Sequence, residues 1–268
     1  MSQIHRSEGR RLFGADPAAY DRARPGHPDR VYDVLLERCG LGPGRAVLEV
    51  GPGTGHATRR LLELGADPLV AVEPDPALAA YLETALGGRI EIWIAPLEDA
   101  KLPTATFDLA AAATSFHWVD EEAGLGKLFS ALRPGGWLAM WWTLFGDDAR
   151  PDSFRDATDS IMQELPLSPH EGSGKPRFPL DTEARTVALR AAGFEQLEHE
   201  LIRWSFEWNT AGIRALFATF SPIARLARAH REAVLDAVAK IAADEFGGHV
   251  TKPLLTSLYT ARRPDRPR

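Results

Sequence analysis

The stretch VLEVGPGTGH at residues 47–56 constrains the fold of this chain more than any other part of the sequence. Branched apolar side chains run without a break into the alternating glycines Gly51, Gly53 and Gly55. A buried strand that leads into a glycine loop and then a helix brings backbone amides close to a ligand at the helix N-terminus. We therefore expect a cofactor to bind at the end of the first sheet strand.

Strand-like and helix-like segments alternate along the first half of the chain. Apolar runs at 45–50, 68–73, 89–95, 107–114 and 137–142 predict strands, and 56–65, 75–87 and 121–136 predict helices. Asp75 followed by Pro76 is a typical helix start. Near-continuous apolar strands separated by helices predict an α/β, doubly wound fold in a single domain, with a parallel sheet covered on both faces.

From about residue 145 this alternation gives way to longer helical and loop-like segments before a closing strand at 254–263. In an open α/β sheet, ligands bind beyond the carboxyl ends of the strands. We therefore expect a cofactor-binding core over 31–142, with 145–180 and 207–250 inserted as a helical cap that contacts the substrate. The first segment, 1–30, is expected to lie across the same edge as an N-terminal gate.

The composition argues against several classes of protein. The net charge of −6 is unlike the basic balance of a nucleic-acid-binding surface. Cys39 is the single cysteine, so no intrachain disulfide can form, which fits a reducing compartment. The start lacks the apolar stretch of a signal peptide, and no apolar run reaches the roughly 18 residues that span a bilayer. The sequence thus predicts a cytoplasmic protein without nucleic-acid or membrane partners, and the scattered histidines predict no metal site.

The glycine loop is one of several motifs in a fixed order. Glu49 and the glycines form ExGxGxG, which resembles motif I of the class I S-adenosylmethionine-dependent methyltransferases. APLEDAKLPTATFDLAAAATSFHWVD (95–120) resembles the adenine-binding turn and motif II of that family, and LRPGGWLAMWW (132–142) resembles motif III. The resemblance implies a Rossmann-like, seven-stranded, mostly parallel sheet with one antiparallel edge hairpin. It also implies S-adenosyl-L-methionine as the cofactor.

A second resemblance covers the beginning of the chain. YDRARPGHP (20–28) is similar to the YxxxRPxYP signature of the small-molecule subgroup of type 11 methyltransferases, which includes trans-aconitate-methyltransferase-like enzymes. SFHWVD (115–120) matches the same subgroup, whereas His27 stands where the subgroup usually has tyrosine. The resemblance implies methyl transfer to an oxygen, or a nitrogen or carbon, of a small organic molecule.

The resemblance and the strand ends together indicate how the cofactor would lie. Glu73 ends the second strand, where an acidic residue binds ribose hydroxyls. Leu97 and Glu98 are expected at the adenine, and Tyr20 over the methionine portion. Arg24 can bind the carboxylate of the cofactor or an acidic substrate. The expected cofactor-binding residues are Tyr20, Arg24, Glu49, Gly51, Gly53, Gly55, Glu73, Leu97, Glu98 and Ser115.

His117 is the candidate catalytic residue, since it directly follows the fourth strand. A histidine can act as a general base near neutral pH, or it can position the substrate, and the sequence leaves both roles open. Three tryptophans, Trp118, Trp204 and Trp208, lie where strands end and are expected to line an apolar substrate pocket.

Two other functions remain compatible with the sequence. A nicotinamide-dependent oxidoreductase also uses a strand, a glycine loop and a helix, but its fingerprint is GxGxxG rather than the GxGxG found here. A non-catalytic S-adenosylmethionine-binding protein is the other alternative, because methyl transfer by proximity and alignment requires few catalytic residues. Titration with both cofactors and turnover with methyl acceptors separate the three.

Overall fold

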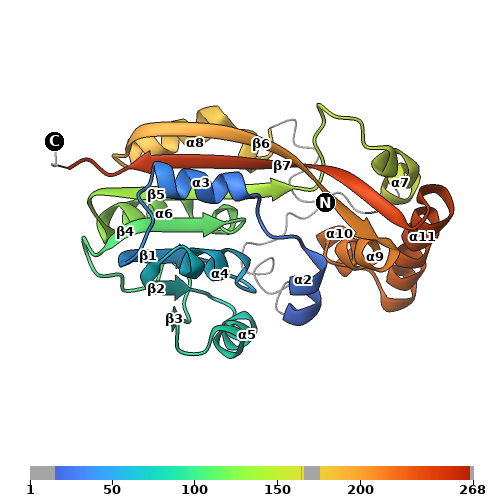
Figure 1. Ribbon diagram of the computed structural model, residues 1–268, viewed down its shortest axis with the longest axis horizontal. Helices are drawn as coiled ribbons and strands as arrows, with labels where there is room; N and C mark the ends of the chain where they lie inside the picture. Colours follow the sequence, from blue (N-terminus) through green and yellow to red (C-terminus); the bar gives the residue numbers. More distant parts are fainter. Residues whose placement is uncertain (1–15, 164, 166–175, 266–268) are drawn as a thin grey trace.

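The centre of the protein is a seven-stranded sheet of order β3-β2-β1-β4-β5-β7-β6. A computed structural model describes residues 16–163, 165 and 176–265 (Figure 1). The strands are β1 (Arg45–Val50), β2 (Ala66–Val72), β3 (Glu91–Trp93), β4 (Phe107–Ala113), β5 (Leu132–Leu144), β6 (Glu195–Asn209) and β7 (His249–Arg262). The first five are parallel, and β7 runs antiparallel to both β5 and β6. The predicted fold, with its antiparallel edge hairpin, is confirmed.

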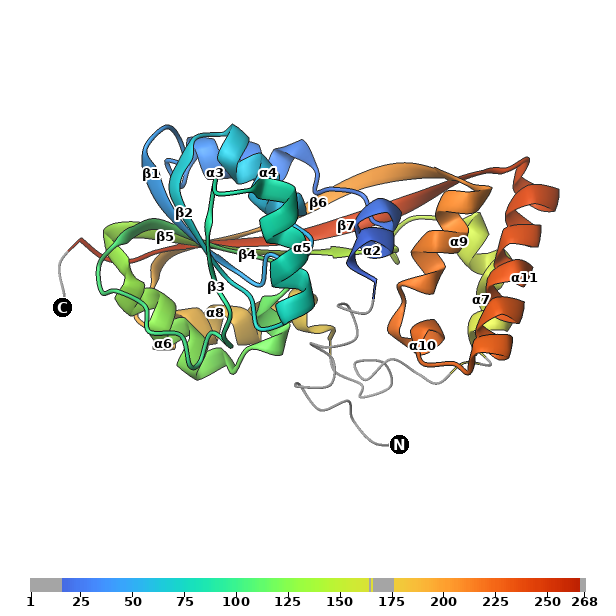
Figure 2. The ribbon, with the colours of Figure 1, turned by 90° about the horizontal axis from the view of Figure 1, so that it is seen from below.

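Helices cover both faces of the sheet (Figure 2). The α-helices are α2 (Pro17–Ala23), α3 (Asp29–Glu37), α4 (His56–Glu63), α5 (Pro76–Leu86), α6 (Glu121–Ala131), α7 (Ser153–Gln163), α8 (Thr182–Ala191), α9 (Thr210–Ala218), α10 (Ser221–Ala224) and α11 (Arg228–Phe246); η2 (Phe116–Trp118) and η3 (Phe178–Leu180) are 3₁₀ turns. Apolar side chains of α3, α4 and α5 form one core with the sheet, and those of α6 and α8 form another on the opposite face. Successive strand residues alternate between them: Trp141 lies in the first core and Trp142 in the second.

Local sequence signals account for where most of these elements begin and end. The Asp75 carboxylate accepts hydrogen bonds from the amides of Ala77 and Leu78, so the predicted N-cap of α5 is confirmed. The helix predicted over 121–136 ends at Ala131, and its last residues belong to β5. Pro134 explains the difference, because its ring and the missing N–H do not fit a helix interior.

The hairpin of β6 and β7 carries the chain beyond the sheet (Figure 1). Pairing between β5 and β7 stops at Leu144 and Leu255, whereas β7 pairs with β6 as far as His249. This extension reaches past the carboxyl end of β5, where α7, α9, α10 and α11 pack with it around a third apolar core. The helical segments thus lie at the sheet edge where a ligand is expected.

Parts of the predicted gate (1–30) and of the first predicted cap segment (145–180) lie outside the described residues, namely 1–15, 164 and 166–175. Within the part of the chain that the structure describes, no helix is long and apolar enough to cross a bilayer.

Candidate functional site

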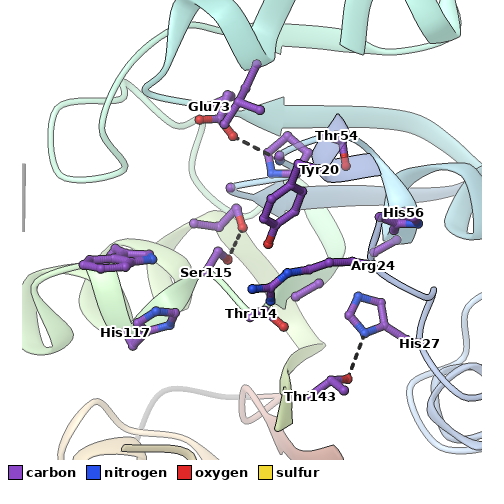
Figure 3. Close-up of a pocket in the computed structure, with 18 of the residues that line it drawn as sticks. Tyr20, Arg24, His27, Thr54, His56, Glu73, Thr114, Ser115, His117 and Thr143 are labelled. Atoms are coloured by element: carbon purple, nitrogen blue, oxygen red, sulfur yellow. Dashed lines mark hydrogen bonds between the residues drawn. The ribbon is translucent and has the colours of Figure 1, made fainter. Parts of the chain in front are cut away.

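A cavity of about 330 Å³ opens at the carboxyl ends of β1, β2, β4 and β5 (Figure 3). It lies between the glycine loop, the residues that follow β4, and the helix α2. The residues that line it include Tyr20, Arg24, His27, Gly51, Gly53, Thr54, His56, Glu73, Leu97, Thr114, Ser115, His117, Trp118, Thr143 and Phe145. Nine of the fourteen residues expected at the site on sequence grounds are in this lining: Tyr20, Arg24, Gly51, Gly53, Glu73, Leu97, Ser115, His117 and Trp118.

The glycines of the loop have different structural roles. All have positive φ, at 63° for Gly51, 59° for Gly53 and 88° for Gly55. A Cβ on Gly51 would lie 2.6 Å from the Cβ of Ser115, so this glycine lets the loop approach the end of β4. A Cβ on Gly53 would meet no atom within 4 Å, which leaves bare backbone at the cavity. Gly55 does not line the cavity, since its missing Cβ makes room for Leu82 of α5.

Glu73 is held rigidly at the end of β2. Its side chain is buried, and Oε2 accepts a hydrogen bond from the backbone N–H of Gly53 at 3.1 Å (Figure 3). Oε1 accepts one from the backbone N–H of Asp75 at 3.0 Å. Each oxygen of a carboxylate can accept more than one hydrogen bond. Glu73 therefore joins the glycine loop to the start of α5 and presents a fixed acceptor to the cavity.

Glu49 is placed differently from the other acidic residue of the motif. It is fully buried within β1 and does not line the cavity. Neither carboxylate oxygen has a hydrogen-bond partner of normal geometry among the described residues. Burial raises the pKa of Glu49 to about 7; the nearby Thr58 hydroxyl opposes this shift, and the charge of Glu73 adds to it.

Helix α2 brings Tyr20 and Arg24 over the cavity. The guanidinium of Arg24 stacks on the rings of Tyr20, at 4.9 Å, and Phe145, at 4.7 Å, and its Nε donates to Thr219 Oγ1 at 3.1 Å. A guanidinium has five N–H donors, so the hydrogen bond to Thr219 uses only one. Arg24 thus connects α2 to the helical part of the molecule and places a positive charge in the cavity (Figure 3).

Asp21 fixes α2 to the glycine-loop side of the site. Its carboxylate contacts Arg59 at 3.3 Å and His56 Nε2 at 3.2 Å, and it accepts a hydrogen bond from the Tyr81 hydroxyl at 3.0 Å. Burial alone would raise the pKa of Asp21, but a hydrogen bond with Thr54, together with His56, Arg59 and Tyr81, lowers it below its ordinary value. The helix is therefore anchored to α4 and α5 by one ionised side chain.

His117 lies in η2, directly after β4. Its Nδ1 accepts a hydrogen bond from the indole Nε1 of Trp142 at 3.0 Å. The rings of Trp118 and Phe178 lie 4.7 Å and 6.5 Å from its own.

Leu97 lines the cavity, whereas Glu98 does not; a carboxylate oxygen of Glu98 accepts a hydrogen bond from the backbone N–H of Asp120 at 2.9 Å.

Trp204 and Trp208 lie outside the cavity. Trp208 is 5% exposed in the third core, and its indole donates to the backbone carbonyl of Ala23 at 3.3 Å. Trp204 packs against the same core, and its indole donates to Thr256 Oγ1 at 3.0 Å. Both are on the extension of β6, which the helices cover. Their positions near the end of a strand in the sequence did not indicate that the helices α7, α9, α10 and α11 pack on that part of β6.

Several lining residues were not among the fourteen site residues expected from the sequence. His27 lies edge-on to Trp141 at 5.6 Å, with its Nδ1 3.4 Å from Thr143 Oγ1. Burial, with a smaller effect of His56, lowers the pKa of His27 to about 3, so this imidazole is neutral. Thr143 and Thr114 lie at the carboxyl ends of β5 and β4, a position that would have marked them as candidates.

The described residues contain no group of three His, Cys, Asp or Glu side chains that could hold a metal ion. The polar groups of the cavity instead include backbone at the glycine loop, the carboxylate of Glu73, the guanidinium of Arg24 and the imidazole of His117. Such a set suits an organic ligand with hydroxyl and carboxylate groups.

Comparison with known proteins agrees with this geometry. Residues 48–140 match the family model described as a methyltransferase domain. An uncharacterized methyltransferase of Mycobacterium tuberculosis is 36% identical over 130 residues, covering 48% of this chain and 51% of that protein. Trans-aconitate 2-methyltransferase from another strain of that species is 32% identical over 127 residues, 47% of each chain. The chain thus spans about half the length of these curated relatives.

Solved structures extend the likeness to most of the chain. A protein of Anaeromyxobacter dehalogenans, assigned as a type II methyltransferase, has a TM-score of 0.64 and 22% identity, covering 91% of this chain and 99% of that one. The [4+2]-cyclase SpnF has a TM-score of 0.60 and 20% identity, covering 97% of both chains. At these identities the likeness shows the fold. The domain match and the motif order make residues 48–140 similar to the methyltransferase domain of class I S-adenosylmethionine-dependent enzymes.

Proposed function

We propose that this protein transfers a methyl group from S-adenosylmethionine to a nucleophile of a small organic acceptor, with oxygen as the favoured atom. The observation that carries the proposal is the position of Glu73 beside Gly53 at the mouth of the cavity. A fixed carboxylate next to bare backbone suits the ribose hydroxyls of a nucleoside cofactor.

We assign the cofactor and the acceptor to different parts of the cavity lining. The glycine loop, Glu73 and Leu97 would hold the cofactor, with Tyr20, Arg24 and Ser115 around its methionine portion. His117, Trp118, Thr143 and Phe145, which follow β4 or lie at the end of β5, are assigned to the acceptor. Methyl transfer needs the nucleophile, the methyl carbon and the sulfur in line, and such alignment accounts for much of the rate in reactions of this kind.

The class of acceptor follows from charge and from the relatives. The net charge of −6 disfavours a nucleic-acid substrate. Arg24 offers a cation in the cavity, and one of the relatives is a trans-aconitate 2-methyltransferase. Small carboxylic acids are therefore the first acceptors to test. The single cysteine, Cys39, is buried and fits the cytoplasm as the location.

The test has two arms. Isothermal titration with S-adenosylmethionine, S-adenosylhomocysteine and NAD⁺ should give binding of the first two and none of the third. Methyl-labelled S-adenosylmethionine is then incubated with separate panels of carboxylic acids (including trans-aconitate), phenols and amines, and labelled product is measured. Binding of NAD⁺ in place of S-adenosylmethionine would favour an oxidoreductase. Cofactor binding without methylation of any panel member would favour the non-catalytic alternative. The [4+2]-cyclase SpnF is an example of a protein of this fold whose name gives another activity than methyl transfer.

A further inference from the structure

The hydrogen bond between Trp142 and His117 determines which nitrogen of His117 carries its proton. The indole Nε1 of Trp142 lies 3.0 Å from His117 Nδ1. An indole N–H can only donate, so Nδ1 must accept with its lone pair. A neutral imidazole with an unprotonated Nδ1 carries its proton on Nε2. Turning the ring over would put a carbon opposite the indole and leave a buried donor without a partner.

We infer that Trp142 is a positioning residue that holds His117 as an Nε2–H hydrogen-bond donor, and that His117 therefore does not act as the base of the reaction. To take up a proton, His117 would have to accept it on Nδ1, where the Trp142 N–H already lies. Two N–H groups would then face each other. This inference rests on the proposed function, because the acceptor side of the cavity is assigned there.

The surroundings of Trp142 make this hydrogen bond rigid. Its side chain is 2% exposed and packs edge-on to Phe178, at 5.5 Å, and to Tyr259, at 6.2 Å. The Tyr259 hydroxyl donates to the backbone carbonyl of Pro179 at 2.9 Å, beside Phe178 in η3. The indole is thus held between β7 and η3 and has little room to turn away from His117.

Phe178 is itself held in place from its other side. The guanidinium of Arg185 lies 3.6 Å from the Phe178 ring and pairs with Glu121 at 2.8 Å. Its NH1 also donates to the Phe178 carbonyl at 3.3 Å. Helices α6 and α8 therefore support the aromatic group around His117. A side chain held in this way keeps one orientation toward the cavity, as catalytic geometry requires.

The chemistry of the step agrees with a donor. A lone pair of the acceptor forms a bond to the methyl carbon while the carbon–sulfur bond breaks, and that electron pair stays on sulfur to give S-adenosylhomocysteine. An acceptor that arrives deprotonated has no proton to lose, so no base is needed. The Nε2 of His117 is the ring nitrogen that is not bonded to Trp142, and we assign its N–H to an acceptor oxygen during the displacement.

Histidine-selective ¹⁵N labelling tests the tautomer directly, without any substrate. We expect long-range ¹H–¹⁵N spectra at pH 7.5 to show a protonated, pyrrole-type Nε2 and a pyridine-type Nδ1 for His117, whose signals are identified by their absence in His117→Gln. Trp142→Phe should bring both nitrogens toward averaged values as the two tautomers mix. The matched control is Trp141→Phe, the same change at the neighbouring residue, whose indole nitrogen has no partner among the described residues; it should leave the His117 signals in place.

Turnover of trans-aconitate, or of the best panel acceptor, gives a second readout. Trp142→Phe should lower kcat/KM by roughly tenfold, the effect of one hydrogen bond, mainly by raising the KM for the acceptor. His117→Gln, which keeps an N–H donor but is not a base, should retain more activity than His117→Ala. A wild-type spectrum with the proton on Nδ1, or His117→Gln as inactive as His117→Ala, would overturn the inference. If Trp142→Phe fails to fold, the ¹⁵N spectrum of the wild-type protein by itself decides which tautomer is present. A wild-type protein that methylates no acceptor would count against the proposed function but not against the tautomer.

Discussion

The backbone N–H of Gly53 donates to Oε2 of Glu73 at 3.1 Å, so the glycine loop after β1 and the acidic end of β2 form one rigid unit. If this unit holds the ribose, Glu73→Gln should lower the affinity for S-adenosylmethionine by about tenfold or more. Hydrogen bonds to a charged group contribute roughly 1.5–3 kcal/mol, and the amide nitrogen of glutamine would face the backbone N–H of either Gly53 or Asp75. Titration calorimetry measures the change, with Glu91→Gln on β3 as the control. Equal affinities in the two folded variants would remove Glu73 from the cofactor site.

Substitutions at Gly53 and Gly51 should act mainly on cofactor binding and on the stability of the fold, respectively. Gly53→Val places a side chain in the open space at the cavity, so we expect loss of S-adenosylmethionine binding, together with some loss of stability because valine is strained at the φ of 59° found there. Gly51→Ala places a methyl group 2.6 Å from the Cβ of Ser115, so it should lower the free energy of unfolding by roughly 1–3 kcal/mol. Adding Ser115→Gly to Gly51→Ala should recover part of that loss in urea unfolding. Full stability of Gly51→Ala by itself would contradict the close approach of the loop to β4.

Glu49 should make the stability of the protein depend on pH. Burial raises its pKa to about 7, from an ordinary value of 4.5. Between these pH values the unfolded chain has released a proton that the folded protein still binds, so the free energy of unfolding falls as the pH rises. The fall should level off above pH 7, and it amounts to at most about 3 kcal/mol.

Glu49→Gln tests this, since an amide does not titrate. The stability of the variant relative to the wild type should increase from pH 5 to pH 8 in urea unfolding. A difference that stays constant over this range would mean that Glu49 is ionised in the folded protein.

Removing only one partner of the buried ion pair between Lys252 and Asp152 should lower the free energy of unfolding strongly. Lys252 Nζ lies 2.6 Å from Asp152 Oδ2, and both side chains are almost fully buried. Lys252→Met leaves the carboxylate without its cation and should destabilise the protein by about 3–5 kcal/mol. Asp152→Asn combined with Lys252→Met should recover most of this loss, because no charge remains buried. The exposed ion pair of Arg155 and Asp148 is the control, and its removal should change the free energy of unfolding only slightly. A double variant as unstable as Lys252→Met would contradict this account.

The anchor of α2 gives a test of the predicted N-terminal gate. Asp21→Asn removes the charge that holds α2 to Arg59. We expect faster amide hydrogen exchange over α2 and weaker S-adenosylmethionine binding, because Tyr20 and Arg24 are carried by that helix and the residue after it. Asp29→Asn, at the start of α3, is the matched control and should leave both unchanged. Unaltered exchange over α2 in Asp21→Asn would mean that other contacts hold it in place.

Features of the site that depend on short stretches of chain could be predicted from the sequence. The apolar run before Gly51 and the residues after it define a strand, a loop and a helix, and parallel strands place Glu73 at the same edge as Gly53. The cap of α5 at Asp75 is equally local, because a side chain there reaches amides only two and three residues away. These features depend only on backbone geometry and on the direction in which strands pair, and both can be inferred from sequence patterns.

The tertiary structure alone decided which side chains meet. Gly55 has the same spacing as Gly51, yet it makes room for Leu82 of α5 rather than lining the cavity, and Trp208 is covered by a helical layer. The contact between His117 and Trp142 joins residues 25 apart, one in the turn η2 after β4 and the other on β5, and it forms because Ala113 of β4 pairs with Trp141 of β5. A shift of one residue in that register would turn Trp142 to the other face of the sheet. Local sequence patterns are enough to define the strands and the loop, whereas the partner of His117 depends on how those strands align and pack.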